Sequence, residues 1–478
     1  MTLSPQQNLI PADVRHVHLM GICGTGMGAL AGMLKCAGYR VTGSDQQVYP
    51  PMSDFLASQG IPVQVGYAAE NLDGRPDLVV VGNVIRRENP EAVALAALGI
   101  PYVSFPQAVG HFFIQQRTSL VVTGTHGKTT TSSLLASMLH AADAEPSFMI
   151  GGLVQAFGRN FNVADGPYFV AEGDEYDTAF FDKGPKFLHY RASIAIITSI
   201  EFDHADIYAD LAAIKASFLR LVASMPSGGA LVVCWDDPVV REVVVDAPCA
   251  VVRYGVGEEC DWRLRDLVVR PGRTSFAVER GGELFGEFES AMPGRHNALN
   301  ALAVIATLAR LGFAQPVIAA GLRAFQGVRR RQEVRGEARG VTVIDDFAHH
   351  PTAVRETLAA LAAAYAGRRL VAVFEPRTNS SRRKVFQDAY ASAFGDAQEV
   401  LVREPLPLAH LDEQERFSSR QLVDDLVSRG VAARYFPSTE EILSHLVATL
   451  RPGDVAAIMS NGGFDNIHQR LLDLLREK

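Results

Sequence analysis

The sequence predicts an α/β protein with more than one domain, and three observations support this prediction. At 478 residues the chain is longer than one hydrophobic core usually supports, so two or three domains are expected. Apolar runs of strand length alternate with helix-periodic stretches along most of the chain, which is typical of largely parallel sheets. Two of the junctions from strand to helix are glycine-rich turns.

Composition and charge make several classes of protein unexpected. The formal net charge is −8, which argues against a broad nucleic-acid-binding surface. No apolar run approaches the roughly 18 residues of a membrane span, so no membrane partner is expected. The N-terminal stretch lacks the basic and apolar regions of a signal peptide. Five cysteines without metal-ligand spacing fit reduced thiols, so we expect a cytoplasmic protein.

The first segment of the chain has the pattern strand, glycine turn, helix, strand. An apolar run over 14–20 leads into Gly24, Gly26 and Ala29, which satisfy G-x-G-x-x-A, and Asp45 ends the second strand. Such a turn offers backbone N–H groups to a diphosphate, and an acid at this distance suits a ribose. A dinucleotide site and a turn that only packs helix against strand both remain open, because this motif alone is weak.

The second segment opens with VVTGTHGKTTT at residues 121–131. A strand, a turn between glycines, a lysine and a hydroxyl residue provide what a triphosphate with Mg²⁺ needs. The spacing differs from the common P-loop, because Val122 stands where the first glycine belongs. A turn that binds nothing is the alternative. We predict a shorter nucleotide-binding loop formed by Gly124, Thr125, His126, Gly127, Lys128, Thr129 and Thr130.

Two polar residues of this segment closely follow apolar strands. Glu172 lies in PYFVAEGDEYD and His204 in SIAIITSIEFDHAD, so both should lie near the carboxyl edge of a sheet, where ligands collect. A carboxylate and an imidazole could hold a second divalent cation beside one at Thr129. Surface solvation is the alternative for each of them. We predict Thr129, Glu172 and His204 as metal ligands.

Later residues complete the pattern. A smaller β-rich portion is expected between 231 and 278, and a helix within 294–312 places Asn297 and Asn300 on one face. The third segment is another α/β series, with Asp346 at a strand end, a helix from Ala353 and a helix ending at Phe394. Asn297 and Asn300 could contact a nucleotide or pack on a neighbouring loop. Asp346 could contact a ribose or phosphate, or only shape a turn.

The motifs GTHGKTT, AEGDEYD, EFDHAD, GRHNALN, GVRRR and DDFAHHP follow the order seen in Mur ligases, and the chain resembles this family over essentially its whole length. The resemblance implies three domains: a Rossmann-like UDP-sugar domain over 1–107, a P-loop-type ATPase domain over 108–327 and an α/β amine-binding domain over 328–478. It assigns the first glycine turn to UDP rather than to NAD. The UDP-sugar site would then comprise Gly21, Gly24, Thr25, Gly26, Met27, Ser44 and Asp45.

The resemblance also implies amide formation that depends on ATP and Mg²⁺. In this chemistry a muramyl carboxylate attacks the γ-phosphate of ATP, and an amine then displaces phosphate from the acyl phosphate. By position in the motifs, the family's catalytic residues would be Lys128, Glu172, His204 and Arg331. Asn297, Asn300 and Asp346 match positions associated with the nucleotide and with domain closure. Several members carry a carbamylated lysine, for which Lys215 is the nearest candidate; its modification stays open.

Four further stretches resemble one branch of the family: VTGSDQQVYPPMSDFL, FFDKGPKFLHYRA, VFEPRTNSSRRK and MSNGGFDNIH. That branch implies UDP-N-acetylmuramate and the murein tripeptide L-Ala-γ-D-Glu-meso-diaminopimelate as substrates, in peptidoglycan recycling. Arginine pairs well with peptide carboxylates. The candidate peptide-binding residues are Arg377, Asn379, Ser380, Arg383, Ser460 and Asn461, with helix capping and surface charge as their alternative.

Three other functions are weighed against this one. Free L-alanine could be the acceptor in the same chemistry, as in UDP-N-acetylmuramate–L-alanine ligase. An NAD(P)-dependent oxidoreductase could use the first glycine turn, but it leaves GTHGKTT unexplained. A nucleotide switch without catalysis does not account for the acidic strand-end motifs. A monomer or weak oligomer is expected.

Overall fold

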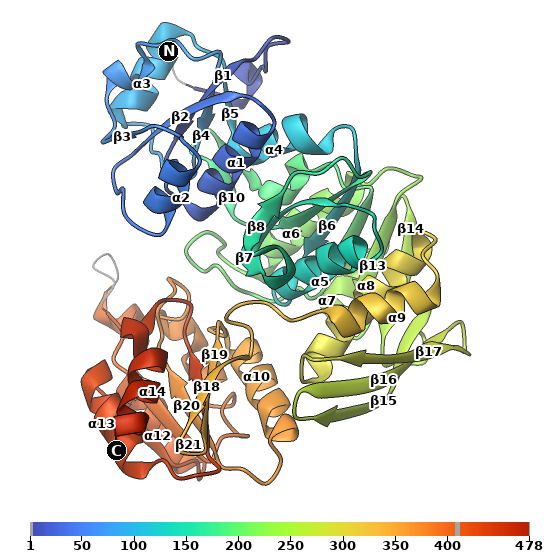
Figure 1. Cartoon of the computed structure of the whole chain (residues 1–478), viewed down its shortest axis with the longest axis vertical. Coiled ribbons are helices and arrows are strands. Elements are labelled where there is room, and N and C mark those ends of the chain that lie inside the picture. The colour runs from blue at the N-terminus through green and yellow to red at the C-terminus, as the bar shows by residue number, and fades with distance from the viewer. Residues whose placement is uncertain (1–2, 407–411, 478) are drawn as a thin grey trace. The chain divides into compact units, whose positions relative to one another are not determined.

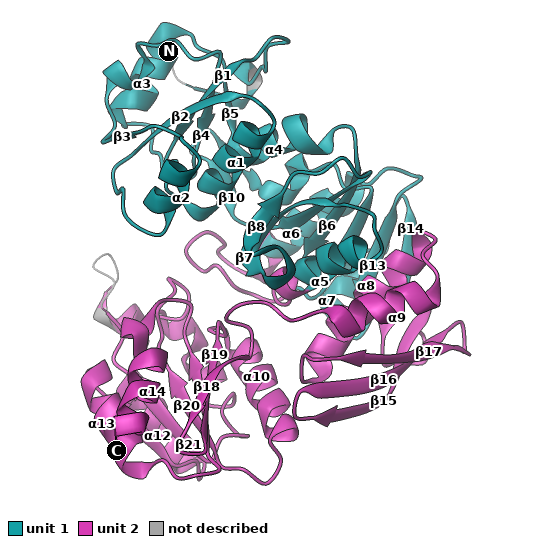
Figure 2. Ribbon diagram, in the orientation of Figure 1, with its two compact units in different colours: residues 1–124, 131–200, 214–252 teal, residues 125–130, 201–213, 253–478 magenta. Residues whose placement is uncertain are grey.

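The computed structural model describes residues 3–406 and 412–477, so the outermost residues of the first and third expected domains lie outside the described part. The chain forms two compact units (Figure 2). Unit 1 comprises residues up to 124 with 131–200 and 214–252, and unit 2 comprises 125–130, 201–213 and 253 onward. Residues 125–130 of the predicted phosphate loop and residues 201–213 therefore belong to the same unit as the C-terminal part.

Unit 1 begins with a five-stranded parallel sheet of order β3-β2-β1-β4-β5. Its core gathers apolar side chains such as Met20, Val79 and Leu95, which are excluded from water. The strands are β1 (His16–Met20), β2 (Arg40–Asp45), β3 (Val63–Val65), β4 (Leu78–Val81) and β5 (Tyr102–Ser104), and the helices are α1 (Thr25–Cys36), α2 (Met52–Ser58), α3 (Pro90–Leu98) and α4 (Phe105–Val109).

A second sheet in unit 1 has the neighbouring strands β13-β12-β6-β9-β7-β8. All of these pairings are parallel except the one between β7 and β8. The strands are β6 (Thr118–Thr123), β7 (Ser147–Val154), β8 (Arg159–Asn162), β9 (Tyr168–Gly173), β12 (Ile194–Ile197) and β13 (Ala230–Cys234), with helices α5 (Lys128–Ala141), α6 (Leu211–Ala223) and α7 (Pro238–Val243) and the hairpin β10 (Asp177–Ala179) and β11 (Asp182–Pro185).

Unit 2 contains the later part of the expected β-rich portion, whose residues up to 252 lie in unit 1. β15 (Trp262–Arg270), β16 (Arg273–Arg280) and β17 (Glu283–Ser290) form an antiparallel meander, and β14 (Ala250–Gly255) pairs with β15 through Tyr254 and Gly255. The expected helix within 294–312 is confirmed as α8 (Arg295–Arg310), and α9 (Gln315–Ala324) follows it.

The C-terminal part of unit 2 is a six-stranded sheet of order β18-β19-β23-β20-β21-β22, parallel except for β18. Separate cores lie on its two faces, one with α10 and one with α13 and α14 (Figure 1). The strands are β18 (Glu333–Ala338), β19 (Val341–Asp346), β20 (Leu370–Phe374), β21 (Glu399–Arg403), β22 (Ala433–Phe436) and β23 (Val455–Met459), and the helices are α10 (Pro351–Ala364), α11 (Gln387–Tyr390), α12 (Ser419–Ser428), α13 (Thr439–Thr449) and α14 (Ile467–Glu477).

The prediction of a helix ending at Phe394 is wrong about where the helix ends. After a 3-10 turn over Lys384–Phe386, α11 ends at Tyr390. The Tyr390 side chain is buried between Phe374 and Phe417, and its hydroxyl donates to the carbonyl of His349. Tertiary packing therefore overrides the local helical pattern here.

The three sheets with flanking helices confirm the α/β class predicted from the sequence. Within the described ranges, none of the helices combines the length and apolar character needed to cross a membrane.

Candidate active site

The predicted phosphate loop lies between the end of β6 and the start of α5. Gly124 and Gly127 have φ values of +125° and +81°, which side chains with a Cβ adopt only with strain. A Cβ on Gly124 would collide with Thr198, and one on Gly127 would lie 2.7 Å from Oδ1 of Asn300. Both glycines are therefore required by backbone conformation and by close neighbours.

The charged and hydroxyl residues of the loop stand at the first turn of α5, where backbone N–H groups lack helical partners. Lys128 is the first residue of α5, and its ammonium donates to the carbonyl of Thr125 at 3.2 Å. The Thr125 hydroxyl accepts from the Glu201 amide at 2.8 Å, which fixes the loop against the segment after β12. A positive end of a helix and a lysine thus meet at one turn, which is an arrangement suited to phosphate.

Thr129 and Arg331 are brought together although they are far apart in the sequence. Nη2 of Arg331 donates to the Thr129 hydroxyl at 3.3 Å, and the guanidinium carbon lies 4.8 Å from the centroid of the Phe347 ring. The hydroxyl that was predicted to hold a metal thus faces a cation.

Asp346 shapes the loop that carries these arginines. Its carboxylate accepts from the amides of Gln332, at 2.8 Å, and Ala348, at 2.7 Å. Burial raises the pKa of Asp346 above its usual range, while nearby Arg331 opposes the shift. The turn-shaping alternative is therefore the role visible in the structure, and a contact with nucleotide stays a prediction.

Asn297 and Asn300 lie on α8 but have different surroundings. Nδ2 of Asn297 donates to the Pro293 carbonyl at 2.8 Å and to the Gln332 side chain at 2.9 Å. The Asn300 amide instead lies against Gly127 of the phosphate loop. Asn300 is therefore the better placed of the two for a nucleotide contact.

The other two predicted metal ligands belong to different units, and each is described within its own. Glu172, in β9 of unit 1, accepts from the amide of Gly151 at 2.7 Å. His204, in unit 2, has a positive φ of 54°, and its amide donates to the Asp203 carboxylate at 2.6 Å. In unit 1, the Lys215 ammonium pairs with the Glu242 carboxylate.

A polar cluster that the sequence did not single out surrounds Glu201. The hydroxyl of Thr352 donates to Oε2 of Glu201 at 2.7 Å, and the same oxygen lies 3.3 Å from Nε2 of His126 and 3.7 Å from Nδ1 of His350. Burial, with His126 the next cause, lowers the pKa of His350. The Glu201 pKa is lowered despite burial, chiefly by hydrogen bonding to His126. Because Glu201 closely follows β12, its strand-end position was the signal that could have revealed it.

The first glycine turn has a different chemistry. The amides of Gly21 and Ile22 both donate to the carbonyl of Ser44, and Asp45 accepts from the amide of Cys23 at 2.8 Å. The buried Ser44 hydroxyl donates to Glu91 at 2.9 Å.

The residues at the start of α1 are the accessible part of this predicted site. Gly24, Thr25 and Gly26 are exposed there, whereas Met27 is buried. Asp45 and Ser44 thus hold the turn together internally, and the helix start remains open for a ligand.

The predicted peptide-binding residues lie in two neighbouring parts of unit 2. Nδ2 of Asn379 donates to Asp206 at 3.0 Å, and the Ser380 hydroxyl accepts from the amide of Ala205 at 3.3 Å. The Ser460 hydroxyl donates to the buried Glu375 at 2.6 Å.

Arg377, Arg383 and Asn461 complete this set. Arg377 is half exposed and lies against Gly462, where a Cβ would meet its guanidinium. Among the described residues, Nε of Arg383 and Oδ1 of Asn461 are buried without a hydrogen-bond partner. Such atoms cost free energy unless a ligand or water satisfies them, so this set has unused binding capacity.

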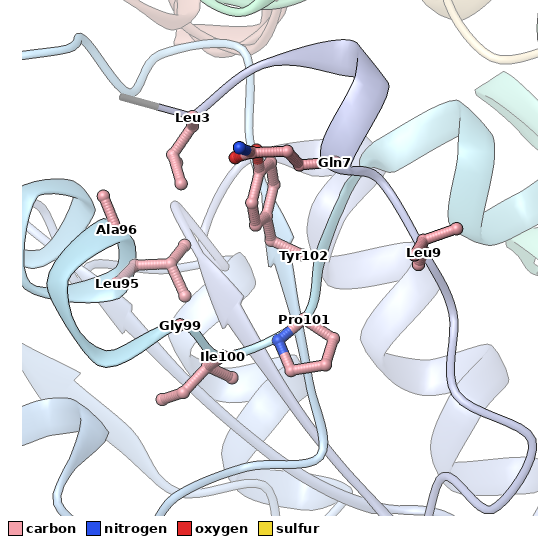
Figure 3. Close-up of a pocket in the computed structure, with 9 residues that line it drawn as sticks. All are labelled: Leu3, Gln7, Leu9, Leu95, Ala96, Gly99, Ile100, Pro101 and Tyr102. Atoms are coloured by element: carbon pink, nitrogen blue, oxygen red, sulfur yellow. The ribbon is translucent and has the colours of Figure 1, made fainter. Parts of the chain in front are cut away.

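One apolar cavity lies away from these residues. It has a volume of about 310 Å³ and is bordered by Leu3, Leu9, Leu95, Ile100 and Tyr102 (Figure 3). Its lining carries no ionisable carboxylate, lysine, arginine or histidine, so it does not offer the chemistry of the phosphate loop.

Comparison with family models finds three matches along the chain. Residues 16–117 match the Mur ligase family catalytic domain, 122–308 the Mur ligase middle domain and 330–462 the glutamate ligase domain of Mur ligases.

Individual relatives cover nearly the whole chain. A UDP-N-acetylmuramate–L-alanyl-γ-D-glutamyl-meso-2,6-diaminoheptandioate ligase of Escherichia coli (strain K12) is 40% identical, over 97% of this chain and 98% of its own. A UDP-N-acetylmuramate–L-alanine ligase of Agathobacter rectalis is 35% identical over 96% and 97%. The crystal structure of a murein peptide ligase from Psychrobacter arcticus superposes with a TM-score of 0.70 at 34% identity, covering 97% of this chain and 99% of that one. With its three α/β domains, this chain belongs to the Mur ligase family.

Proposed function

We propose that the chain joins UDP-N-acetylmuramate to the tripeptide L-Ala-γ-D-Glu-meso-diaminopimelate, using ATP and passing through an acyl phosphate. The observation that carries the proposal is the phosphate loop with Lys128 at the start of α5, in a chain 40% identical to a ligase of that printed name over 97% of its length. A role in recycling cell-wall peptides in the cytoplasm accompanies this activity.

Charge neutralisation is the task of the nucleotide site. When the muramyl carboxylate attacks the γ-phosphate, two anions must approach, and Lys128 and Arg331 supply positive charge near Thr129. The new bond joins a carboxylate oxygen to phosphorus as the bond to ADP breaks. The amine of the tripeptide then attacks the acyl carbon, and phosphate leaves.

Magnesium fits the donor groups proposed for it. The Thr129 hydroxyl accepts from the guanidinium of Arg331, which uses one of the two lone pairs of this oxygen, so the second lone pair could serve a cation. We propose Thr129 as a ligand of one Mg²⁺ ion and Glu172 and His204 as ligands of a second, with oxygen donors predominating as Mg²⁺ prefers. Bound there, the ions would withdraw charge from the phosphate oxygens.

The acceptor peptide is proposed to bind the third domain through Arg377, Asn379, Ser380, Arg383, Ser460 and Asn461. Support comes from the buried and unpartnered Nε of Arg383 and Oδ1 of Asn461, which are one donor and one acceptor. A tripeptide carries carboxylates and amide N–H groups that match such atoms. Free L-alanine is smaller and has no peptide N–H, so it would leave more of them unsatisfied.

We further propose the domain boundaries 1–107, 108–327 and 328–478. The interval between the second and third matched regions, from 308 to 330, includes the proposed boundary at 327, whereas the first matched region extends past 107 to residue 117. We also propose that the protein is a monomer or a weak oligomer.

Phosphate release from ATP tests the proposed reaction. With UDP-N-acetylmuramate and Mg²⁺ present, release should depend on the tripeptide and be much slower with L-alanine. Faster release with L-alanine would instead favour the alanine-adding activity, whose named relative is 35% identical. If neither the tripeptide nor L-alanine stimulates phosphate release, both proposed acceptors are contradicted.

A further inference from the structure

Three side chains of unit 2 converge outside the set proposed for magnesium. The side-chain ligand atoms of His126, Glu201 and His350 all lie within 4.8 Å of one another. Oε2 of Glu201 is 3.3 Å from Nε2 of His126 and 3.7 Å from Nδ1 of His350. Tetrahedral Zn²⁺, with bonds of about 2.0–2.2 Å, places neighbouring ligand atoms roughly 3.3–3.5 Å apart. The two Glu201 distances are therefore close to the ligand spacing of such an ion, and binding would require Nε2 of His126 to release the hydrogen that it donates to the carboxylate.

The orientation of His350 is suited to metal binding. Its Nε2 lies 3.1 Å from the carbonyl of Phe202, and since a carbonyl only accepts, Nε2 carries the hydrogen. The lone pair then stands on Nδ1, on the side of Glu201. A histidine that donates its other N–H to a backbone carbonyl is the usual outer-shell arrangement of a metal ligand. The amide of Thr352, 3.3 Å from Nδ1, shares this lone pair and would have to release it.

Glu201 has an outer-shell partner as well. The Thr352 hydroxyl donates to its Oε2 at 2.7 Å, which fixes the carboxylate. A carboxylate has about four lone-pair positions, so this bond leaves room for a metal. The side chains of Glu201 and His350 thus direct two acceptor atoms toward one point, an arrangement that a cation stabilises.

We propose that His126, Glu201 and His350 form a site for a transition-metal ion of the zinc class, with water as the fourth ligand. Two imidazole nitrogens and one carboxylate oxygen suit Zn²⁺ or Co²⁺, whereas Mg²⁺ prefers oxygen ligands. None of the three residues belongs to the proposed magnesium set. The site is a feature of the fold and does not depend on which amine the enzyme uses.

Binding of such an ion has a regulatory consequence. His126 belongs to the phosphate loop, Glu201 follows β12, and His350 caps the start of α10. An ion shared by these three segments would hold the phosphate loop to the C-terminal part of unit 2. Because the loop must admit and release nucleotide, the ion is expected to slow turnover.

Titration of the untagged full-length protein with Co²⁺ tests the site without requiring activity. Excess Mg²⁺ is included to occupy oxygen-rich sites, and the visible spectrum distinguishes strongly absorbing tetrahedral cobalt from weakly absorbing octahedral cobalt. We expect one equivalent of tetrahedral cobalt, which Zn²⁺ displaces. The apparent affinity should fall at least tenfold in His350→Asn and in Glu201→Gln. Asparagine at position 350 keeps an acceptor for the helix N-terminus.

The matched control is His445→Gln. His445 pairs with Glu399 at 2.9 Å elsewhere in unit 2, so losing it removes a histidine next to a carboxylate without touching the cluster. This variant should keep the cobalt spectrum, and circular dichroism should show that all variants are folded. If His350→Asn does not fold, Glu201→Gln decides. Absence of the tetrahedral band in the wild type, or its persistence in Glu201→Gln, would overturn the proposal.

Discussion

The two glycine turns of the chain share a backbone plan but differ in their chemistry. Each connects a parallel strand to a helix, β1 to α1 in one case and β6 to α5 in the other. At the first turn, Asp45 accepts from the amide of Cys23, so an anion holds the turn. At the second, Lys128 donates to the carbonyl of Thr125 and Arg331 to the hydroxyl of Thr129, so cations gather there.

This difference shows why a glycine motif alone is weak evidence for a ligand. Both turns offer backbone N–H groups to an anion, but only the second adds two cationic side chains, which a triphosphate requires. The first suits a diphosphate flanked by neutral groups, as in UDP or NAD. The second turn and the family membership of the chain therefore argue against the alternative of an NAD(P)-dependent oxidoreductase.

The largest effect on turnover is expected when a positive charge is removed from the second turn. Lys128→Ala should lower turnover on the order of a hundredfold or more, because a charge-stabilising donor is lost near the reacting phosphate. The measurement is phosphate release at saturating substrates. Lys35→Ala, an exposed lysine of α1, is the control and should retain full activity. Near-normal turnover of Lys128→Ala would remove this turn from the active site.

Alanine at one glycine of each turn should separate their ligands. In Gly127→Ala, the φ of +81° and a Cβ 2.7 Å from Asn300 would distort the loop, so the KM for ATP should rise about tenfold or more. In Gly24→Ala the φ of −66° is unstrained, but a methyl group is added at the exposed start of α1. The KM for UDP-N-acetylmuramate should then rise. Equal effects of both variants on both substrates would contradict the division of labour.

A moderate effect on the KM for the tripeptide is expected when a proposed peptide-binding residue is replaced. Arg377→Ala should raise the KM for the tripeptide about tenfold, since a hydrogen bond to a charged group contributes about 1.5–3 kcal/mol. The KM for ATP should not change. Arg434→Ala, which removes a well-exposed arginine beside Glu399, is the matched control. An unchanged KM for the tripeptide in Arg377→Ala would exclude this arginine from peptide binding.

The smallest effect concerns acid stability around α8. Burial, with Arg331 the next cause, lowers the pKa of His296 from 6.5 to about 4. Between these values the unfolded chain binds a proton that the folded chain does not, so stability is complete above pH 6.5 and is lost toward pH 4. Allowing for partial solvent screening, about 1 kcal/mol should be lost at pH 5.

The melting temperatures at pH 7.5 and pH 5 measure this loss. His296→Asn should show a smaller decrease between the two conditions than the wild type, by roughly 1–3 °C. An identical decrease in both proteins would show that His296 does not titrate as its surroundings require.

Local patterns predicted much of the architecture. Strand-length apolar runs and one-face helical spacing located the sheets and α8, and the order of the motifs indicated the family. Residue types also indicated a turn at Gly124 and Gly127, where the structure has positive φ values that favour glycine. That this turn binds phosphate stays a prediction. The same local reasoning failed for the helix expected to end at Phe394, where packing of Tyr390 decides the outcome.

Contacts between distant residues could not be predicted from the sequence. Arg331 meets Thr129 across 202 positions, and Thr352 meets Glu201 across 151. Neither pair has a local signature, because each joins residues that lie far apart in the sequence and meet only in the folded unit. The sequence indicated Thr129 through its loop and Arg331 through the resemblance, but it singled out neither Glu201 nor Thr352.

A competition between acceptors tests the central claim most directly. The enzyme is incubated with ATP, Mg²⁺, UDP-N-acetylmuramate and equal concentrations of L-alanine and L-Ala-γ-D-Glu-meso-diaminopimelate, and the UDP-linked products are measured by mass spectrometry. We predict that UDP-muramyl-tripeptide predominates and forms with one equivalent of ADP. Predominance of UDP-muramyl-alanine would contradict the proposed acceptor and assign the chain to the alanine-adding activity.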